Sequence, residues 1–281
     1  MKTLEILTAA LFCAAAFAGT APAKPAAGRT ASGHCKVRLV QWNIHIGIDM
    51  TFRWNLKAQA DVLNRIGGDV VVLNEVDKNC RRTGYTDMTG ALALLTGNMF
   101  HQFGAARALP PEGLYGNAVL SRWPMELVGA WPIPSPAYES RSMTLVKIAA
   151  PAPFYVAFTH LNHRKAPEEN LIRVAAVRKI DELISQNCKD GLPAVIAGDF
   201  NCVPGSDPVK ALEEAGWTLG TPLLTFPSKK PRVSIDHVFF REGMVKLENR
   251  FTVDEKNASG HVPVVNELVI FRSTPQKKGK K

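Results

Sequence analysis

The stretch AVIAGDFNCVPGSDP, residues 194–208, constrains the fold of this chain more than any other. It opens with an almost continuous apolar run, which is typical of a strand buried on both faces. It then reaches Asp199 and Asn201 before a Pro-Gly-Ser turn. Either residue alone is ordinarily a turn former or the start of a loop. The two residues therefore raise the question of whether other strands end in the same way.

Three further segments run apolar and β-branched before they turn polar, so each is typical of a buried strand whose end reaches a surface. They are KVRLVQWNIHIG (36–47), DVVVLNEVD (69–77) and FYVAFTHLN (154–162). Their polar parts contain Asn43, Glu75 and His160. Because the carboxyl ends of parallel strands line up along one edge of a sheet, we expect these groups to share a cleft with Asp199 and Asn201.

Helices alternate with these strands in two places. The segment 52–68 has apolar residues at helical spacing and stops at a Gly pair. The segment 166–185 begins with Pro167 in its first turn, and its apolar residues form one stripe. That stripe consists of Leu171, Val174, Val177, Ile180 and Ile184.

Elsewhere, consecutive strands joined by short turns are expected at 115–124, 139–158 and 233–253. This mixture of alternating and consecutive strands predicts an α/β protein. The expected architecture is a four-layered α/β sandwich, in which two mixed β-sheets pack face to face with helices outside.

Length and composition favour one soluble domain. The chain has 281 residues, of which 46% are hydrophobic and 21% charged, which argues against disorder and against a multispan membrane protein. Residues 1–23, with Lys2 before a short apolar run and small residues, are typical of a secretory signal peptide. An uncleaved anchor helix is the alternative. We expect a flexible linker at 24–34, the domain at 35–273, a basic disordered tail at 274–281, and a secreted or periplasmic location.

The charges and the cysteines add two narrower expectations. The net charge of +9 includes four lysines of the tail PQKKGKK, so the body of the chain is only mildly basic. The tail is either solvated or in contact with a phosphate-rich or anionic surface. Export would place the cysteines of the domain in an oxidising compartment, where three pairings are open and no zinc spacing is present. These cysteines are Cys35, Cys80, Cys188 and Cys202.

Eight motifs occur in an order that resembles the endonuclease/exonuclease/phosphatase superfamily, which includes deoxyribonuclease I. They are QWNIHIG, VVLNEVD, YGNAVLSRWP, FTHLN, AGDFNCVPGS, TFPSKKP, SIDHVFF and SGHVPVV, and they cover nearly all of the chain from Cys35 to Arg272. The resemblance implies the two-sheet fold and metal-dependent hydrolysis of a phosphate ester. It does not fix the substrate, because such a fold serves many substrates.

The resemblance also implies roles for individual residues. Glu75 matches the family's metal-binding glutamate and Asn43 the residue that assists it, with Mg²⁺ as the expected ion and Mn²⁺ as an alternative. Asp199 matches the acid that orients or deprotonates the attacking water. Asn201 matches the amide that fixes the geometry of the water or the phosphate.

Two histidines match those that flank the scissile phosphate, His160 and His261, and Asp236 matches the acid behind the second. An imidazolium in that place donates to a nonbridging oxygen. Arg141 matches a phosphate-binding arginine, with a solvated strand-edge charge as the alternative. Asn117 is either a phosphate-facing amide or a turn former.

Two loops adjoin the motif strands, DKNCRRTG (77–84) and TFPSKKPR (225–232). We therefore expect Arg82 and Arg232 to flank the cleft and to bind the substrate. That substrate is a phosphate ester: a nucleic acid, a phospholipid headgroup or a small phosphodiester. Nuclease and phospholipid or inositol-phosphate hydrolase remain alternatives. No protein partner is inferred, and a monomer is expected.

One position departs from the family. The last motif usually reads Ser-Asp-His, whereas this chain has Ser259-Gly260-His261. A carboxylate that some members use as a metal ligand is therefore absent, which affects the affinity and number of metal ions. The alternative function is a catalytically silent member of the same fold that binds a phosphate ligand.

Overall fold

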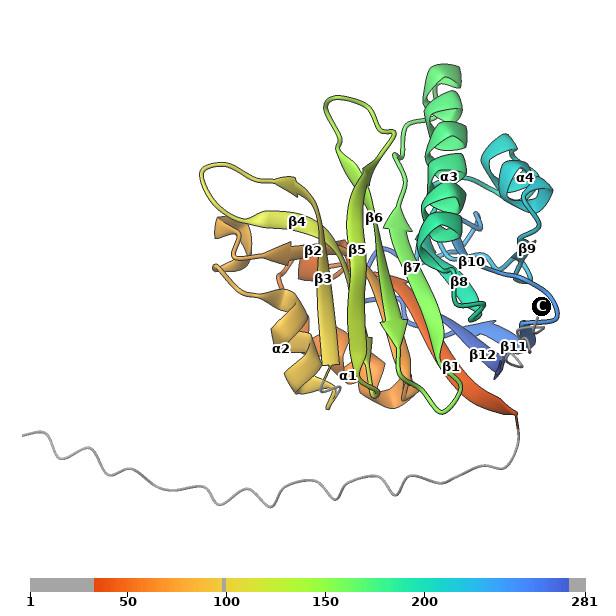
Figure 1. Ribbon diagram of the computed structural model, residues 1–281. Coiled ribbons are helices and arrows are strands. Elements are labelled where there is room, and N and C mark those ends of the chain that lie inside the picture. Colours follow the sequence, from red (N-terminus) through yellow and green to blue (C-terminus); the bar gives the residue numbers. More distant parts are fainter. Residues whose placement is uncertain (1–32, 98–99, 273–281) are drawn as a thin grey trace, which may run out of the picture. The chain divides into compact units, whose positions relative to one another are not determined.

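The computed structural model describes residues 33–97 and 100–272, which form two mixed six-stranded sheets (Figure 1). The first sheet has the order β11-β12-β1-β2-β4-β3, with β1 His34–Asn43, β2 Val70–Lys78, β3 Phe100–Ala108, β4 Leu114–Ser121, β11 Val245–Thr252 and β12 Val264–Phe271. The second has the order β5-β6-β7-β8-β10-β9, with β5 Met125–Ile133, β6 Arg141–Ile148, β7 Phe154–His160, β8 Ala194–Asp199, β9 Thr218–Leu219 and β10 Asp236–Phe240.

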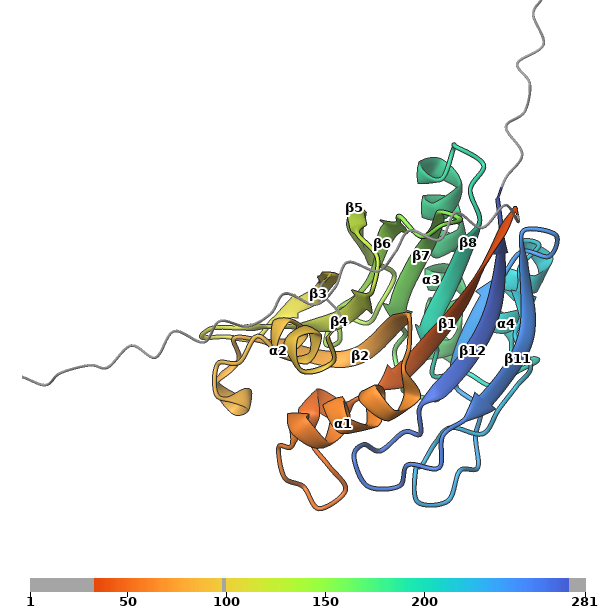
Figure 2. The same cartoon turned by 90° about the horizontal axis from the view of Figure 1, so that it is seen from below.

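Helices cover the outer faces of both sheets. The α-helices are α1 Leu56–Ile66, α2 Met88–Leu95, α3 Pro167–Asn187 and α4 Asp207–Glu214. Helices α1 and α2 pack on the first sheet, and α3 and α4 pack on the second (Figures 1 and 2). The expected four-layered sandwich is confirmed.

Alternating side chains along each strand build the layers. In β1, Leu39 packs between the sheets, whereas Val40 packs under the helices of the first sheet. In β7, Val156 lies between the sheets and Ala157 faces the α3 side. Because both faces of these strands are buried, their sequences are apolar throughout.

The parallel strand pairs lie where the polar strand ends predict them. β1 and β2 are parallel, with Asn43 opposite Asn74, and β7 and β8 are parallel, with His160 opposite Asp199. The carboxyl ends of one parallel pair from each sheet therefore meet at the same edge of the sandwich (Figure 2). β10 pairs antiparallel with β8 and places Asp236 opposite Asp199.

Helix α1 follows the signals in its sequence, since the Asn55 side chain caps its first turn and Gly67 ends it in the left-handed conformation. In α3 the predicted stripe is wrong at Leu171, which is 69% exposed. The buried face of the first turns carries Glu169 and Arg173 instead. Both residues hold the loop after β7 through Asn162. Arg173 Nη1 donates to the backbone oxygen of Asn162 at 3.0 Å, and Glu169 accepts a hydrogen bond from the side-chain amide of Asn162.

The structure tests only some of the remaining expectations. The segments expected to form the signal peptide (1–23) and the tail (274–281), and all of the expected linker except Gly33 and His34, lie outside the described residues. Within the described ranges, no helix is long and apolar enough to cross a membrane. None of the three possible disulfide pairings is formed, because all four cysteines of the domain are free thiols.

Candidate active site

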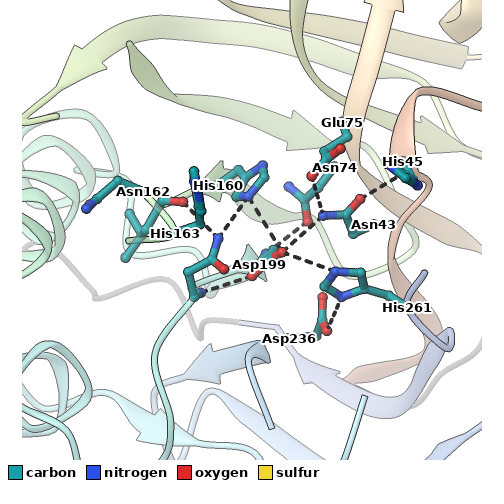
Figure 3. Close-up of polar contacts among 12 residues, drawn as sticks. Asn43, His45, Asn74, Glu75, His160, Asn162, His163, Asp199, Asp236 and His261 are labelled. Carbon is teal, nitrogen blue, oxygen red and sulfur yellow. Dashed lines mark hydrogen bonds and ion pairs between the residues drawn. The ribbon is translucent and has the colours of Figure 1, made fainter. Parts of the chain in front are cut away.

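A cleft of about 630 Å³ opens at the edge where the two parallel pairs meet. Eight of the residues selected from the sequence line it: Asn43, Glu75, Arg82, Arg141, His160, Asp199, Asn201 and His261. Asp236 lies behind His261 (Figure 3). The cleft therefore collects polar ends of β1, β2, β7 and β8, as their sequences predict.

Glu75 enters the cleft because β2 is irregular at this residue. The register with β4 shifts between Asn74 and Val76, and Glu75 has a φ of 58°, in the left-handed region. Asn43 Nδ2 donates to Glu75 Oε1 at 3.0 Å and to Asp199 Oδ2 at 3.0 Å. Its Oδ1 accepts from the backbone N–H of His45, which fixes the orientation of the amide.

Asp199 is 1% exposed and lies at the centre of the polar network. Its Oδ2 faces both imidazoles, 3.5 Å from His160 Nε2 and 3.8 Å from His261 Nε2. Its Oδ1 accepts from the backbone N–H of Asn201. Burial raises the pKa of Asp199, and the charge of Asp236 adds to the shift. A carboxylate with a raised pKa is a stronger base near neutral pH.

His261 and Asp236 form a buried pair, in which His261 Nδ1 lies 2.9 Å from Asp236 Oδ2. Gln41 donates to the other Asp236 oxygen at 2.9 Å. Burial opposes the charge on His261, but Asp236, Asp199 and Glu75 outweigh it and raise the pKa of His261 to about 9. At neutral pH the ring is therefore an imidazolium that presents Nε2–H to the cleft.

His160 is neutral, in contrast to the charged His261. Burial lowers its pKa well below the usual value, and the charge of Arg141 adds to the effect. Asn201 Nδ2 lies 3.0 Å from His160 Nε2 and 3.0 Å from the Leu161 carbonyl oxygen, which identifies that end of the side chain as the donor. His160 Nε2 therefore accepts, and the proton of the neutral ring is on Nδ1.

Asn74 is a positioning residue that the sequence analysis missed. Its Oδ1 accepts from the backbone N–H of Asp199 at 2.9 Å and from Gln41 at 3.0 Å. Its Nδ2 donates to the Thr159 carbonyl oxygen at 2.8 Å and to Asn117 at 2.9 Å. One amide of the first sheet thus fastens β7 and β8 of the second. The sequence feature that could have identified Asn74 is its position next to Glu75 in the motif VVLNEVD.

Of the four expected substrate-binding residues, two line the cleft and two do not. Arg141 lines the cleft and is 4% exposed, and Arg82 also lines it. Asn117 lies behind the site, where it accepts from Asn74. Arg232 is not among the residues that line the cleft.

Two places in the site have metal-ligand chemistry. Asp199, Asp236 and His261 bring ligand atoms within 4.8 Å of one another. In that group, however, His261 Nδ1 is engaged with Asp236, and an imidazolium has no lone pair for a metal. Glu75 offers a carboxylate oxygen, Oε2, that makes no hydrogen bond with the described residues. We regard Glu75, steadied by Asn43, as the better candidate ligand.

The chain belongs to the endonuclease/exonuclease/phosphatase family, whose model matches residues 40–259. Over 242 residues it is 27% identical to the uncharacterized protein YbhP of Escherichia coli (strain K12), covering 80% of this chain and 93% of YbhP.

Solved structures share the fold. An endonuclease/exonuclease/phosphatase from Beutenbergia cavernae superposes with a TM-score of 0.70 at 22% identity, covering 85% of this chain and 72% of the other. The mannosyl-6-phosphatase Bt3783 of Bacteroides thetaiotaomicron superposes with a TM-score of 0.64 at 14% identity, covering 83% and 99%. At these identities the likeness concerns the fold alone.

Proposed function

We propose that this protein is a divalent-metal-dependent phosphoesterase, which hydrolyses a phosphodiester or phosphomonoester by attack of water. The observation that carries the proposal is the arrangement of His261 and Asp199 on the wall of a cleft that also contains Glu75, with Asp236 behind His261. This arrangement provides a charged hydrogen-bond donor in His261, a buried base in Asp199 and an unengaged carboxylate oxygen in Glu75. Membership of the family and a fold shared with a sugar phosphatase support it.

Each residue has a role in this reaction. Asp199 accepts the proton of the attacking water, and Asn201 and Asn43 hold its carboxylate in place. His261 donates from Nε2 to a nonbridging phosphate oxygen, because Asp236 keeps the ring charged. The neutral His160 holds the amide of Asn201. Arg141 binds the phosphate through its guanidinium.

A divalent ion fits Glu75, since Mg²⁺ binds proteins through one or two carboxylates while it keeps water and phosphate ligands. The carboxylate is half-buried at the cleft, with one oxygen held by Asn43 and the other unengaged. Bound there, Mg²⁺ or Mn²⁺ would neutralise the phosphate oxygens. Gly260 supplies no side-chain ligand, so a single loosely held ion is expected.

Hydrolysis of bis(4-nitrophenyl) phosphate tests the proposal. We expect turnover with Mg²⁺ or Mn²⁺, loss of turnover in EDTA, and loss in Asp199→Asn. Asp61→Asn is the matched control, because Asp61 is exposed on α1 and pairs with Lys57. Absence of hydrolysis across this diester, plasmid DNA, RNA, phosphoinositides and sphingomyelin would instead favour the silent phosphate-binding alternative.

We also propose that the protein is exported, on the signal-peptide pattern of residues 1–23. Mass spectrometry of the chain purified from a bacterial expression host tests this proposal. A mature chain that begins after Ala23 is expected, and a chain that retains residues 1–23 would contradict it.

A further inference from the structure

Three arginines converge on one wall of the cleft, near Glu75. Arg82 comes from the turn Arg81–Thr83, Arg107 from β3, and Arg141 from the start of β6. They surround Tyr115 of β4, and all four residues line the cleft. The guanidinium carbons of Arg107 and Arg82 lie 5.1 and 5.7 Å from the centroid of the Tyr115 ring.

Two of the arginines are held in place by acids. Arg82 Nε and Nη2 each lie 2.7 Å from an oxygen of Asp77, whose side chain is 0% exposed. This bidentate contact leaves Arg82 Nη1 unengaged. Arg141 Nη2 lies 2.6 Å from Glu139, while its buried Nε and Nη1 have no hydrogen-bond partner in the described part of the chain.

Arg107 has no such acid. Among the described residues it makes no ion pair and no hydrogen bond, and its buried Nε has no acceptor. A buried donor without an acceptor is costly to a folded protein. Together with Arg141, it presents unpaired N–H groups that require an acceptor with several oxygens, and a phosphoryl group is such an acceptor.

The charges around Tyr115 lead to the same conclusion. Asp77 and Glu139 are each paired with one arginine, whereas no acid among the described residues forms an ion pair with Arg107. Burial and the nearby Glu75 raise the pKa of Tyr115, so its hydroxyl keeps its proton and can donate. The group that completes this wall is therefore an anion.

We propose that Arg82, Arg107 and Tyr115 form a second anion subsite, which binds a phosphoryl group next to the cleaved one that Arg141 binds. The inference rests on the proposed phosphoesterase function and names its substrate class, a phosphate ester with a second phosphoryl group nearby. A nucleotide chain and a small bisphosphate share this chemistry.

Two pairs of chromogenic substrates test the subsite. One is thymidine 5′-(4-nitrophenyl phosphate) with and without a 3′-phosphate, and the other is 2-hydroxyethyl 4-nitrophenyl phosphate with and without a phosphate on its hydroxyl. In each pair we expect kcat/KM to be at least about tenfold higher for the compound with two phosphoryl groups, mainly through a lower KM. Preference in both pairs assigns the subsite to the phosphoryl group itself, and preference in the thymidine pair alone assigns it to a nucleotide chain.

Arg107→Gln should reduce the ratio of the two kcat/KM values to near one. Arg107→Lys keeps the charge without the fork of donors and should retain part of the preference. Arg178→Gln is the matched control, since Arg178 is exposed on α3, away from the cleft, and its ratio should match that of the unmodified protein.

A binding measurement separates this inference from the proposed reaction. In EDTA, inorganic pyrophosphate should raise the melting temperature by about 2 °C or more in the unmodified protein and much less in Arg107→Gln. If no chromogenic compound reacts and the wider panel of substrates named above is not hydrolysed either, the phosphoesterase is overturned, and the melting experiment still decides the subsite. Equal kcat/KM values within both pairs, or a pyrophosphate shift unaffected by Arg107→Gln, would overturn the subsite.

Discussion

Five of the non-glycine residues that line the cleft have a positive φ, and three of these, His45, Glu75 and Asn201, belong to its polar network. The φ angles are 47° at His45, 58° at Glu75 and 49° at Asn201. Each such residue costs about 1 kcal/mol, and it persists only where its surroundings fix it. Here the β-bulge fixes Glu75, and hydrogen bonds to Asn43 and Asp199 fix the other two. The backbone conformation, and not the side-chain rotamers alone, therefore determines the orientation of these three side chains.

Isosteric removal of charge should therefore abolish activity without unfolding the protein. We expect Asp199→Asn and Glu75→Gln each to lower kcat/KM by about 10²- to 10⁴-fold. The melting temperature should change little, because burial already disfavours the charged form of Asp199 and an amide can still accept from Asn43. Turnover equal to that of the unmodified protein in either variant would refute the site assignment.

Gly260 gives a second prediction at this scale. Its φ is not in the positive range, and an added Cβ would meet only Phe226 Cε2 at 3.9 Å, an ordinary contact. Gly260→Asp should therefore fold and add a carboxylate beside His261. We expect the Mg²⁺ concentration at half-maximal rate to fall by about tenfold, because affinity rises with ligand charge. An unchanged half-saturation in a stable variant would mean that this position does not reach the metal.

At the scale of elements, strong periodicity and capping residues allowed the correct prediction of α1 and α3, whereas α2 and α4 were missed. Each of the missed helices has eight residues, which is too short a run for periodicity to identify a helix by itself, and α2 carries Gly90 in an almost wholly apolar run. The face of α3 was misjudged at Leu171, because the periodic pattern did not reveal that Glu169 and Arg173 hold the loop after β7. Such contacts depend on tertiary structure.

A matched pair within α3 tests that correction. Ile180→Ala removes a fully buried side chain and should lower the free energy of unfolding by about 2–4 kcal/mol. Leu171→Ala trims a largely exposed side chain and should cost less than about 0.5 kcal/mol. Urea unfolding of both variants gives the comparison, and equal costs would contradict the burial described here.

At the scale of the whole molecule, the two sheets together form the site. The polar strand ends could be predicted from the sequence because each belongs to one strand. Gln41, Arg107 and Tyr115 could not, since their roles arise from contacts between sheets or between distant strands. Neither their spacing nor their composition sets them apart from ordinary strand residues.

His237 should make global stability sensitive to acid. It is fully buried, its Nε2 lies 2.8 Å from the Cys202 carbonyl oxygen, and burial lowers its pKa to about 4. The unfolded chain takes up this proton near the usual value of 6.5, so stability is complete above that pH and falls between 6.5 and 4. The expected loss from this residue is about 3 kcal/mol.

Urea unfolding measured across that pH range tests the effect. His237→Gln should flatten the slope, while the other groups whose pKa values burial shifts, Asp199 and His160 among them, continue to act in both proteins. Identical slopes would show that His237 does not remain neutral in the fold.

The first sheet is built from both ends of the described chain, because β1 pairs with β12 and the whole second sheet lies between them in sequence. His261 lies between β11 and β12. During synthesis, a nascent chain that stops before Val245 leaves β1 with an unpaired edge and lacks the charged imidazole. Unpaired edges are templates for aggregation. Premature release from the ribosome should therefore yield aggregation-prone fragments, and a reporter fused after Phe271 would register only chains able to complete the candidate active site.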